Sequence, residues 1–351
     1  MTVSQTKNFS IPDSPATIAH NYIEFKLWYY NIFEIKDKKI LAGIEQSIRD
    51  GKITQEDLYS KKLVFNSLFE GHGQDEFFAV LESIKDQPWF NESRIVFLNN
   101  VFGNFDSPIK SVSWTWNMVN HGGFLDYVNS LEINWENLDR NRDFICLMRR
   151  RSYLRAKLFN RLRSKYHLDD YYVSYASMIN YTEFDKIAGV QIPVLLDGHT
   201  FGAQQHSAND PRIFSSIINL VVETSNQEPT GDYCWRSRFA SEKTFKCFAW
   251  HQIPIWWTVP NFVNDIRSLG FDVFDDLTHG HQYDSETDPD IRMESMLDTL
   301  DHVRSQIHFK GIDKFNKEIM PRFKKNYQKL IDFSNRRMSH WPEIINHVRS
   351  I

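Results

Sequence analysis

Three consecutive residues with complementary chemistry begin a predicted helix: Ser241, Glu242 and Lys243. Serine is a favoured helix N-cap, and an acidic residue in the first turn suits the positive end of the helix dipole. Phe245 and Phe248 continue the segment at helical spacing. Backbone N–H groups at a helix start, together with a lysine ammonium, can bind a phosphate. Taken alone, these residues also fit an ordinary N-cap followed by a solvated lysine, and that simpler interpretation is favoured.

A basic stretch forms a second candidate for anion chemistry. Residues 144–148 are apolar and predict a buried strand, and Leu154, Leu158 and Leu162 mark the buried face of a helix that follows it. The other positions around this helix are strongly basic: Arg149, Arg150, Arg151, Arg155, Lys157, Arg161, Arg163 and Lys165. A basic helix can be a solvated face or a nucleic-acid surface. Its position directly after a strand favours a phosphate site, because arginine suits bidentate phosphate contacts.

Four segments match, in order, the motifs of one enzyme family. They are Phe-Ile-Cys-Leu-Met-Arg-Arg at 144–150 with Leu154-Arg155, Leu-Val-Val-Glu-Thr at 220–224, Ser-Glu-Lys-Thr-Phe-Lys at 241–246 with Ile-Pro-Ile at 253–255, and Leu-Gly-Phe-Asp-Val-Phe at 269–274 with Tyr283-Asp284, Asp288 and Arg292. No segment is specific alone, but their order is. Over residues 144–305 the chain resembles fucosyltransferase-like glycosyltransferases, and is most similar to a loosely characterised group found in viral and environmental sequences.

The resemblance implies an α/β fold of the GT-B type, with two Rossmann-like domains facing a cleft, a helical N-terminal elaboration and a C-terminal closing helix. It implies transfer of a sugar from a nucleotide-sugar, with a GDP-sugar favoured, to a hydroxyl acceptor, typically on a glycan. No separate cofactor is expected, and the reaction is expected to be metal-independent because basic residues neutralise the diphosphate. No residue matches a motif for the catalytic base, which the resemblance places in the first domain.

The resemblance also assigns roles to individual residues. The donor diphosphate is expected to contact Arg155, Lys243 and Arg150. Residues expected to hold the donor sugar or nucleoside are Glu242, Glu223, Ser241, Tyr233 and Asp197. A glutamate at the end of a strand would accept hydrogen bonds from ribose or sugar hydroxyls, and Tyr233 would stack on the base. Asp197 is equally well explained as a loop-capping residue.

The domain boundaries follow from the predicted elements. Residues 1–140 are assigned to the acceptor-side domain, which is predicted to be helical from residue 14 to about residue 70 and to have its first strand at 94–98. Residues 141–310 form the donor-binding domain. Residues 311–351 contain a long helix, predicted from residue 313 to 337, that closes the donor domain or crosses back to the first.

Composition limits the classes of protein to consider. The formal net charge of −4 argues against a globally basic nucleic-acid binder. No apolar run reaches the ~18 residues of a membrane span, and the polar first ten residues lack the core of a signal peptide. The three cysteines make no disulfide framework, so a cytoplasmic protein is expected. Two alternatives keep the fold: a transferase that modifies a DNA base, with the basic helix on the duplex, and a non-catalytic carbohydrate-binding protein.

Overall fold

The computed structural model of the protein describes residues 16–18, 22–26, 39–67, 74–99, 110–113, 133–148, 153–167, 171–175, 213–223 and 238–350. Its contacts divide the chain into two units, residues 1–115 with 340–351, and residues 116–339. The sequence-based boundaries lie at 140 and 310 instead. Each unit is built around its own sheet.

The first unit contains a five-stranded sheet in the order β1-β2-β3-β4-β5. All neighbouring strands are parallel except β1 and β2, which are antiparallel. The strands are β1 (Ala16–Ile18), β2 (Tyr22–Lys26), β3 (Lys62–Ser67), β4 (Ile95–Asn99) and β5 (Lys110–Ser113). Strand β4 confirms the strand expected at 94–98.

The prediction of a continuous helical region from residue 14 to about 70 is wrong for β1, β2 and β3. In β2, Ile23 and Phe25 are buried, whereas Tyr22 and Glu24 are partly exposed, which is the two-residue period of a strand. Phe25 pairs with Phe65 of β3, and their rings stack at 5.2 Å between centroids. Closely spaced aromatic residues fit either a helix or a strand, and only pairing with a distant segment decides between them. The rest of that aromatic stretch, residues 27–33, lies outside the described residues.

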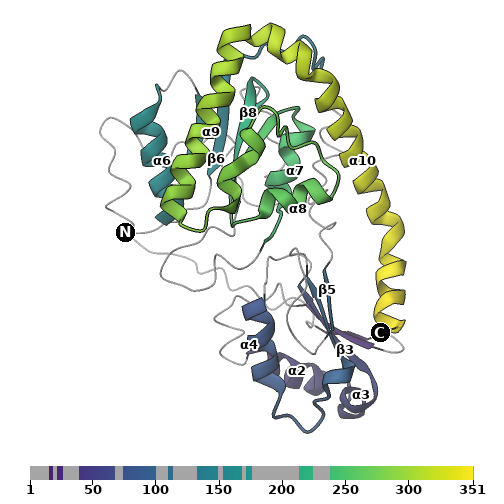
Figure 1. Cartoon of the computed structure of the whole chain (residues 1–351). Helices are drawn as coiled ribbons and strands as arrows, with labels where there is room; N and C mark the ends of the chain where they lie inside the picture. Colours follow the sequence, from purple (N-terminus) through teal and green to yellow (C-terminus); the bar gives the residue numbers. More distant parts are fainter. Residues whose placement is uncertain are drawn as a thin grey trace, which may run out of the picture. The chain divides into compact units, whose positions relative to one another are not determined.

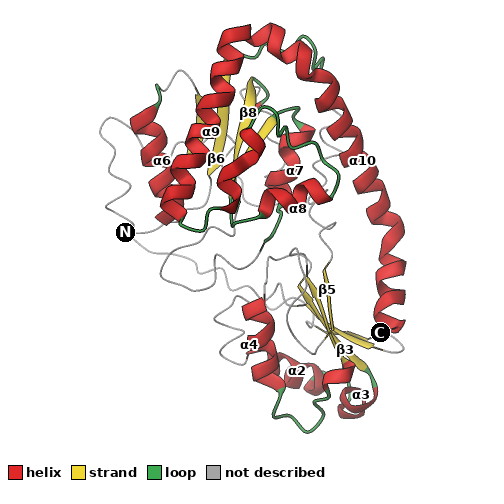
Figure 2. Cartoon of the chain, viewed as in Figure 1, coloured by secondary structure: helices red, strands yellow, loops and turns green. Residues whose placement is uncertain are grey.

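Helices α2 (Lys39–Arg49), α3 (Gln55–Ser60) and α4 (Gln74–Ile84) gather beside this sheet (Figure 2). Helices α2 and α3 lie within the region expected to be helical, from residue 14 to about residue 70. Gly51, with φ of 67°, follows the end of α2, and Thr54 caps α3 through a capping box with Asp57. A short 3₁₀ turn, η2 (Glu92–Arg94), leads into β4. The helices bury apolar side chains, Ile44 and Phe77 among them, against the same face of the sheet as Phe65.

The second unit contains a four-stranded sheet in the order β7-β6-β8-β9. Its strands are β6 (Arg142–Met148), β7 (Tyr171–Tyr175), β8 (Ser216–Val222) and β9 (Ile253–Trp257). All three neighbouring pairs are parallel. Every residue of β8 and β9 is buried, as expected of parallel strands covered on both faces. The strand expected at 144–148 is confirmed.

Helices cover both faces of this sheet (Figure 1). The helices are α6 (Tyr153–Lys165), α7 (Glu242–Ala249), α8 (Phe262–Ser268) and α9 (Pro289–Lys310). Trp257 belongs to the core shared with α6 and α9, whereas Trp256, on the opposite face, packs against Phe248 of α7 and Phe262 of α8. In the described residues, a helix follows each of β6, β8 and β9, and these helices lie on either side of the sheet, as in Rossmann-like folds.

The C-terminal part of the chain is helical. The 3₁₀ turns η7 (His279–Ser285) precede α9, and Gly311, with φ of 79°, separates α9 from α10 (Ile312–Ser350). Helix α10 buries Phe315, Ile319 and Phe323, as its apolar spacing predicts. Among the helices of the described residues, none combines the length and the apolar character needed to cross a membrane. The protein is thus an α/β protein whose sheets are largely parallel, which is compatible with a Rossmann-like fold.

Candidate functional site

The strand order of the second unit indicates where a ligand would bind. Along the chain β6 pairs first with β7 on one side, and β8 then pairs on the other side of β6, so the direction of winding reverses between β6 and β8. In open α/β sheets, ligands bind outside the carboxyl ends of the strands at such a switch point. Strand β6 ends at Met148 and β8 ends at Val222. The residues that follow these two positions therefore define the candidate site.

Arg155 bridges the two strands at this point. It lies in the first turn of α6, and its side chain is buried, with 4% relative exposure. Its Nη2 donates to the carbonyl oxygens of Glu223, at 3.1 Å, and Val222, at 3.4 Å. The guanidinium thus connects the start of the helix after β6 to the carboxyl end of β8. Parallel strands alone bring these residues together, because they are far apart in the sequence.

Glu223 follows β8 and is fully buried, with 0% exposure. Its Oε1 accepts a hydrogen bond from the backbone N–H of Ser241 at 3.1 Å, and its Oε2 accepts one from Ser241 Oγ at 2.6 Å. The hydroxyl of Thr244 also donates to Oε1. One carboxylate therefore receives three hydrogen bonds from the first turn of α7. Thr244 was not predicted as part of the site; its position one turn into a helix that faces Glu223 is visible only once the strands are paired.

Ser241, Glu242 and Lys243 form the other side of the cluster. Ser241 is the N-cap of α7, as predicted, and its Oγ accepts from the Lys243 backbone N–H at 3.2 Å. The Lys243 Nζ lies 3.2 Å from Ser241 Oγ and 3.4 Å from Glu242 Oε1. The Lys243 side chain keeps 30% of its surface exposed, against 17% for Glu242. An ammonium and the N–H groups of a helix start therefore lie together at the sheet edge.

Five of the eight sequence-predicted site residues are brought together here. They are Arg155, Glu223, Ser241, Glu242 and Lys243. The other three, Arg150, Asp197 and Tyr233, lie outside the described residues. Chemically, the partly exposed ammonium of Lys243 at the start of α7 can contact an anion such as a diphosphate, whereas Arg155 is buried and donates to backbone carbonyls. No group of three or more His, Cys, Asp or Glu residues suited to a metal occurs within the described ranges.

The downstream motif residues support the loops beside the cluster. The Tyr283 hydroxyl accepts from the Trp256 backbone N–H at 2.9 Å, and Asp284 Oδ2 accepts from Val263 N at 2.9 Å, at the start of α8. Asp288 caps α9 through the N–H groups of its first turn. Arg292 is fully buried, and its Nη2 lies 3.8 Å from Asp284 Oδ1. These residues fix the elements that follow β9.

Two aspartates beside the cluster interact electrostatically, the partly buried Asp265 and the buried Asp284, and the sequence does not predict this. Asp265 lies 3.3 Å from Arg238, which directly precedes the Phe239-Ala240-Ser241 segment. Burial raises the pKa of Asp265 to about 6, and the charge of Asp284 adds to the effect, while Arg238 opposes it. Burial also raises the pKa of Asp284 to about 6, against the opposing charge of Arg292. No spacing pattern in the sequence marks these aspartates as neighbours.

Three basic residues of α6 are paired with acidic residues of α9. Lys157 Nζ lies 2.5 Å from Asp290, and Arg161 makes two hydrogen bonds of 2.7 Å to Glu294. Lys165 Nζ lies 3.5 Å from Asp298 and 2.8 Å from Asp301. We call these pairs the α6–α9 ladder. Its positive charges face carboxylates of the same unit, which is the arrangement of a neutralised surface rather than of a duplex-binding face.

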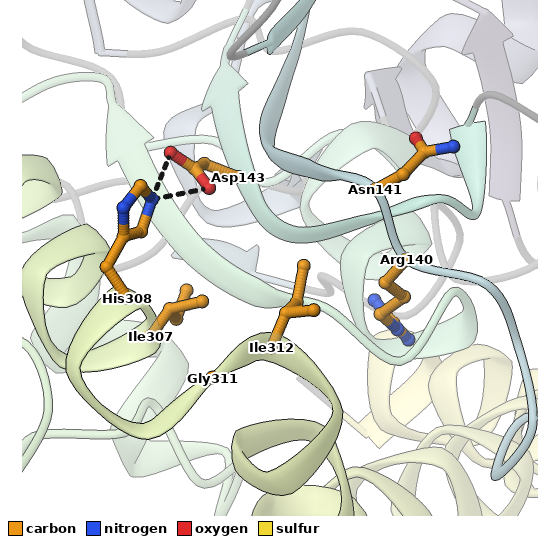
Figure 3. A pocket seen from close by; sticks show the side chains of 7 residues that line it. All are labelled: Arg140, Asn141, Asp143, Ile307, His308, Gly311 and Ile312. Atoms are coloured by element: carbon orange, nitrogen blue, oxygen red, sulfur yellow. Dashed lines mark hydrogen bonds and ion pairs between the residues drawn. The ribbon is translucent and has the colours of Figure 1, made fainter.

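A pocket of about 350 Å³ lies at the opposite, amino-terminal edge of the same sheet. Figure 3 shows Asp143 near the start of β6, with His308 of α9 directed at both of its oxygens. The Arg304 Nε also donates to Asp143, at 2.8 Å. Arg140, another lining residue, donates to the backbone carbonyls of Ser216 and His251. This pocket lies at the amino-terminal ends of the strands, whereas open α/β sheets bind ligands beyond the carboxyl ends, so the switch point is the better candidate.

Compared with protein-family models, with curated proteins and with solved structures, the chain gives no match. The geometry of the switch point and the motif resemblance are therefore the observations that bear on function.

Proposed function

We propose that the protein is a glycosyltransferase, related to the fucosyltransferase-like enzymes, that transfers a sugar from a nucleoside-diphosphate sugar to an acceptor hydroxyl. One observation carries the proposal: Arg155, Glu223, Ser241 and Lys243 converge at the carboxyl ends of β6 and β8. Residues from three separate motifs meet where α/β sheets bind nucleotides. A nucleoside diphosphate is the anionic ligand that suits this position.

In the proposed reaction, the acceptor oxygen forms a bond to the anomeric carbon of the sugar. The bond from that carbon to the diphosphate breaks, and its electron pair leaves with the nucleoside diphosphate. The proton of the acceptor hydroxyl passes to a carboxylate base. Charge develops on the leaving diphosphate, and preorganised cations and N–H groups stabilise it. Lys243, which is 30% exposed, is the direct contact, and the buried Arg155 holds the carboxyl end of β8 through the carbonyls of Val222 and Glu223.

The proposal extends to parts of the protein beyond the described cluster. The two units form a GT-B pair, with the donor on the second unit and the acceptor and catalytic base on the first. Arg150 is a further diphosphate contact, and Tyr233 and Asp197 face the nucleoside or sugar. The favoured donor is a GDP-sugar and the favoured acceptor a glycan hydroxyl, both from the motif resemblance.

A ligand panel read by thermal unfolding tests this function. A ligand that binds only the folded state raises the melting temperature. At a ligand concentration of one hundred times its Kd, the free energy of unfolding increases by about 2.7 kcal/mol. GDP, UDP, ADP, CDP and inorganic pyrophosphate are each added in the presence of EDTA. We expect one nucleoside diphosphate to raise the melting temperature of the wild type and of Lys246→Ala, but much less that of Lys243→Ala.

Three outcomes would contradict the proposal. Stabilisation that requires added Mn²⁺ or Mg²⁺ overturns its metal-independent form. Stabilisation by free sugars with none by any nucleotide indicates a carbohydrate-binding protein instead. Tight binding of duplex DNA with a steep salt dependence moves the function to nucleic acid.

A further inference from the structure

Glu223 lies at the centre of a chain of hydrogen bonds that ends at the Lys243 ammonium. Its side chain has no exposed surface, and both of its oxygens face the first turn of α7. Ser241 Oγ donates to Glu223 Oε2 at 2.6 Å, and the Lys243 Nζ donates to the same Ser241 Oγ at 3.2 Å. The carboxylate and the ammonium are therefore connected through one hydroxyl group.

The direction of the Ser241 hydrogen depends on Glu223. A serine hydroxyl has one hydrogen to donate and two lone pairs that accept. Because the hydrogen points to Glu223, the lone pairs are left to the Lys243 backbone N–H and to its ammonium. Thr244 and the Ser241 backbone N–H hold the carboxylate in place from the same helical turn. Glu223 thus fixes the orientation of the serine that holds the lysine.

We propose that Glu223 is a positioning residue that sets the place of the Lys243 ammonium through Ser241, and that it does not contact the donor. Its complete burial gives a ribose no surface to approach. This role differs from the ribose contact that the motif resemblance implies for the same residue. The ligand that Lys243 receives comes from the proposed function, but the connection from Glu223 to Lys243 does not depend on it.

Substitution of Glu223 by glutamine isolates this connection. The glutamine oxygen can still accept from Ser241 N and Thr244, but its NH₂ group then faces Ser241 Oγ as a donor. The serine hydroxyl must turn its hydrogen away from residue 223, toward the side that Lys243 occupies. The Lys243 ammonium then has no lone pair of Ser241 Oγ to which it can donate. Glutamine has the size of glutamate, so the fold is retained. Ser241→Ala removes the same connection while Glu223 stays.

Lysine reactivity in the ligand-free protein is the first test. The full chain is reductively methylated with formaldehyde and cyanoborohydride, and the modification of each lysine is followed by peptide mass spectrometry. In Glu223→Gln and in Ser241→Ala, we expect methylation of Lys243 to accelerate about threefold or more, because a charge-assisted hydrogen bond is lost. Lys246, one turn further along α7 and near the Trp250 ring, is the internal reference and should keep its rate.

Two further results bear on the same connection. Thr244→Val removes a donor to Glu223 but leaves Ser241 in place, so Lys243 should be methylated at nearly the wild-type rate. An unchanged Lys243 rate in both Glu223→Gln and Ser241→Ala overturns the proposal. If Glu223→Gln does not fold, Ser241→Ala and Thr244→Val still decide between the two outcomes.

The second test separates positioning from ribose contact. Binding of inorganic pyrophosphate and of the nucleoside diphosphate that stabilises the wild type is measured for Glu223→Gln by calorimetry. If Glu223 is a positioning residue, Glu223→Gln should weaken the binding of both ligands by a similar factor, about fivefold. It should cause no further loss of affinity in a Lys243→Ala background. If Glu223 contacts the ribose, Glu223→Gln should weaken the binding of the nucleotide only. The loss of affinity should then add to that caused by Lys243→Ala. If the wild type binds neither ligand, the proposed function fails, while the methylation result still decides the role of Glu223.

Discussion

Two sides of helix α6 use the same kind of charge in opposite ways. On the exposed side, Lys157, Arg161 and Lys165 meet carboxylates of α9 in the α6–α9 ladder. On the buried side, Arg155 donates to backbone carbonyls at the end of β8. The sequence shows all four as members of one basic run. Position relative to the strand ends, and not the number of basic residues, separates the candidate site from the ladder.

The two sides also differ in the energy at stake. An exposed ion pair contributes about 0–1 kcal/mol, because water already solvates both charges and salt screens their attraction. A buried charged group that loses its hydrogen-bond partners costs several times more. Substitutions on the two sides should therefore separate into large and small effects, and Arg155→Ala and Lys165→Ala measure that difference directly.

Arg155→Ala should have the largest effect. It leaves the carbonyls of Val222 and Glu223 without this donor and opens space in a packed region, so unfolding should be easier by about 3 kcal/mol. Nucleoside-diphosphate binding should be lost as well. Arg155→Lys should recover only part of both, since an ammonium lacks the planar fork of a guanidinium. Urea unfolding and calorimetry measure the two quantities. If Arg155→Ala were as stable as the wild type, the buried and exposed sides of α6 would not differ in their contribution to stability.

Lys243→Ala should reduce ligand affinity without a matching loss of stability. One charge-assisted phosphate contact is worth about 1.5–3 kcal/mol, so we expect the Kd of the diphosphate to rise about tenfold or more. The side chain is partly exposed, so the unfolding free energy should change by less than about 0.5 kcal/mol. Lys246→Ala on the same helix is the matched control. Equal losses for both lysines would point to a general electrostatic attraction.

Asp265→Asn should change the pH dependence of stability. The pKa values of Asp265 and Asp284 are raised to about 6, so protonation of these groups stabilises the folded state. This contribution is complete when the pH lies below the ordinary aspartate pKa, and it is lost as the pH rises through 6. Burial lowers the pKa values of His251 and His281 to about 4. Their contribution is full above the ordinary histidine value and is lost as pH falls through 4. The two pairs therefore oppose each other across the same interval.

When one aspartate is removed, the loss of stability that the histidines cause at falling pH should be less compensated. From pH 6.5 to 4.5, we expect Asp265→Asn to lose about 1 kcal/mol more stability than the wild type. Thermal unfolding at a series of pH values measures this slope. Asp298→Asn, in the exposed ladder, should keep the wild-type slope. An identical slope for Asp265→Asn would mean that this carboxylate titrates normally in the folded protein.

Lys165→Ala should have the smallest effect. Its partners Asp298 and Asp301 are 78% and 38% exposed, so the loss of stability should stay below about 1 kcal/mol and shrink further in high salt. Diphosphate affinity should not change, because the residue lies at the far end of α6 from the strand ends. A loss of affinity equal to that of Lys243→Ala would return the whole basic helix to the list of ligand contacts.

Local sequence signals predicted the second unit better than the first. A continuous apolar run defines β6 and an N-cap serine defines the start of α7, and both elements are where the sequence places them. Strand β2 was missed because Tyr22, Ile23 and Phe25 fit two periods, and its pairing with β3 is not visible in a short window. Prediction succeeded where a local pattern fits only one kind of element, and it failed where the pattern fits two.

Within the candidate site, the sequence predicted residue types but not their connections. Ser241 and Lys243 are neighbours in the chain, so their proximity is a local property. The contact of Arg155 with Glu223 and the carboxylate pair of Asp265 and Asp284 arise from the sheet and its crossings, which no local spacing encodes. The ladder was unpredictable for the same reason, since a charged helix face looks solvent-exposed until its partner helix is known.

The α6–α9 ladder has a consequence for how α9 finds its place. Its pairs Lys157–Asp290, Arg161–Glu294 and Lys165–Asp298 recur at intervals of one helical turn. A slide of α9 by one turn, about 5.4 Å, would again set Arg161 opposite an acid, so the charge pattern alone is degenerate. The fully buried Arg292 has no such second position, because Asp284 lies on a different element. The interior, and not the charged surface, must select the helix register.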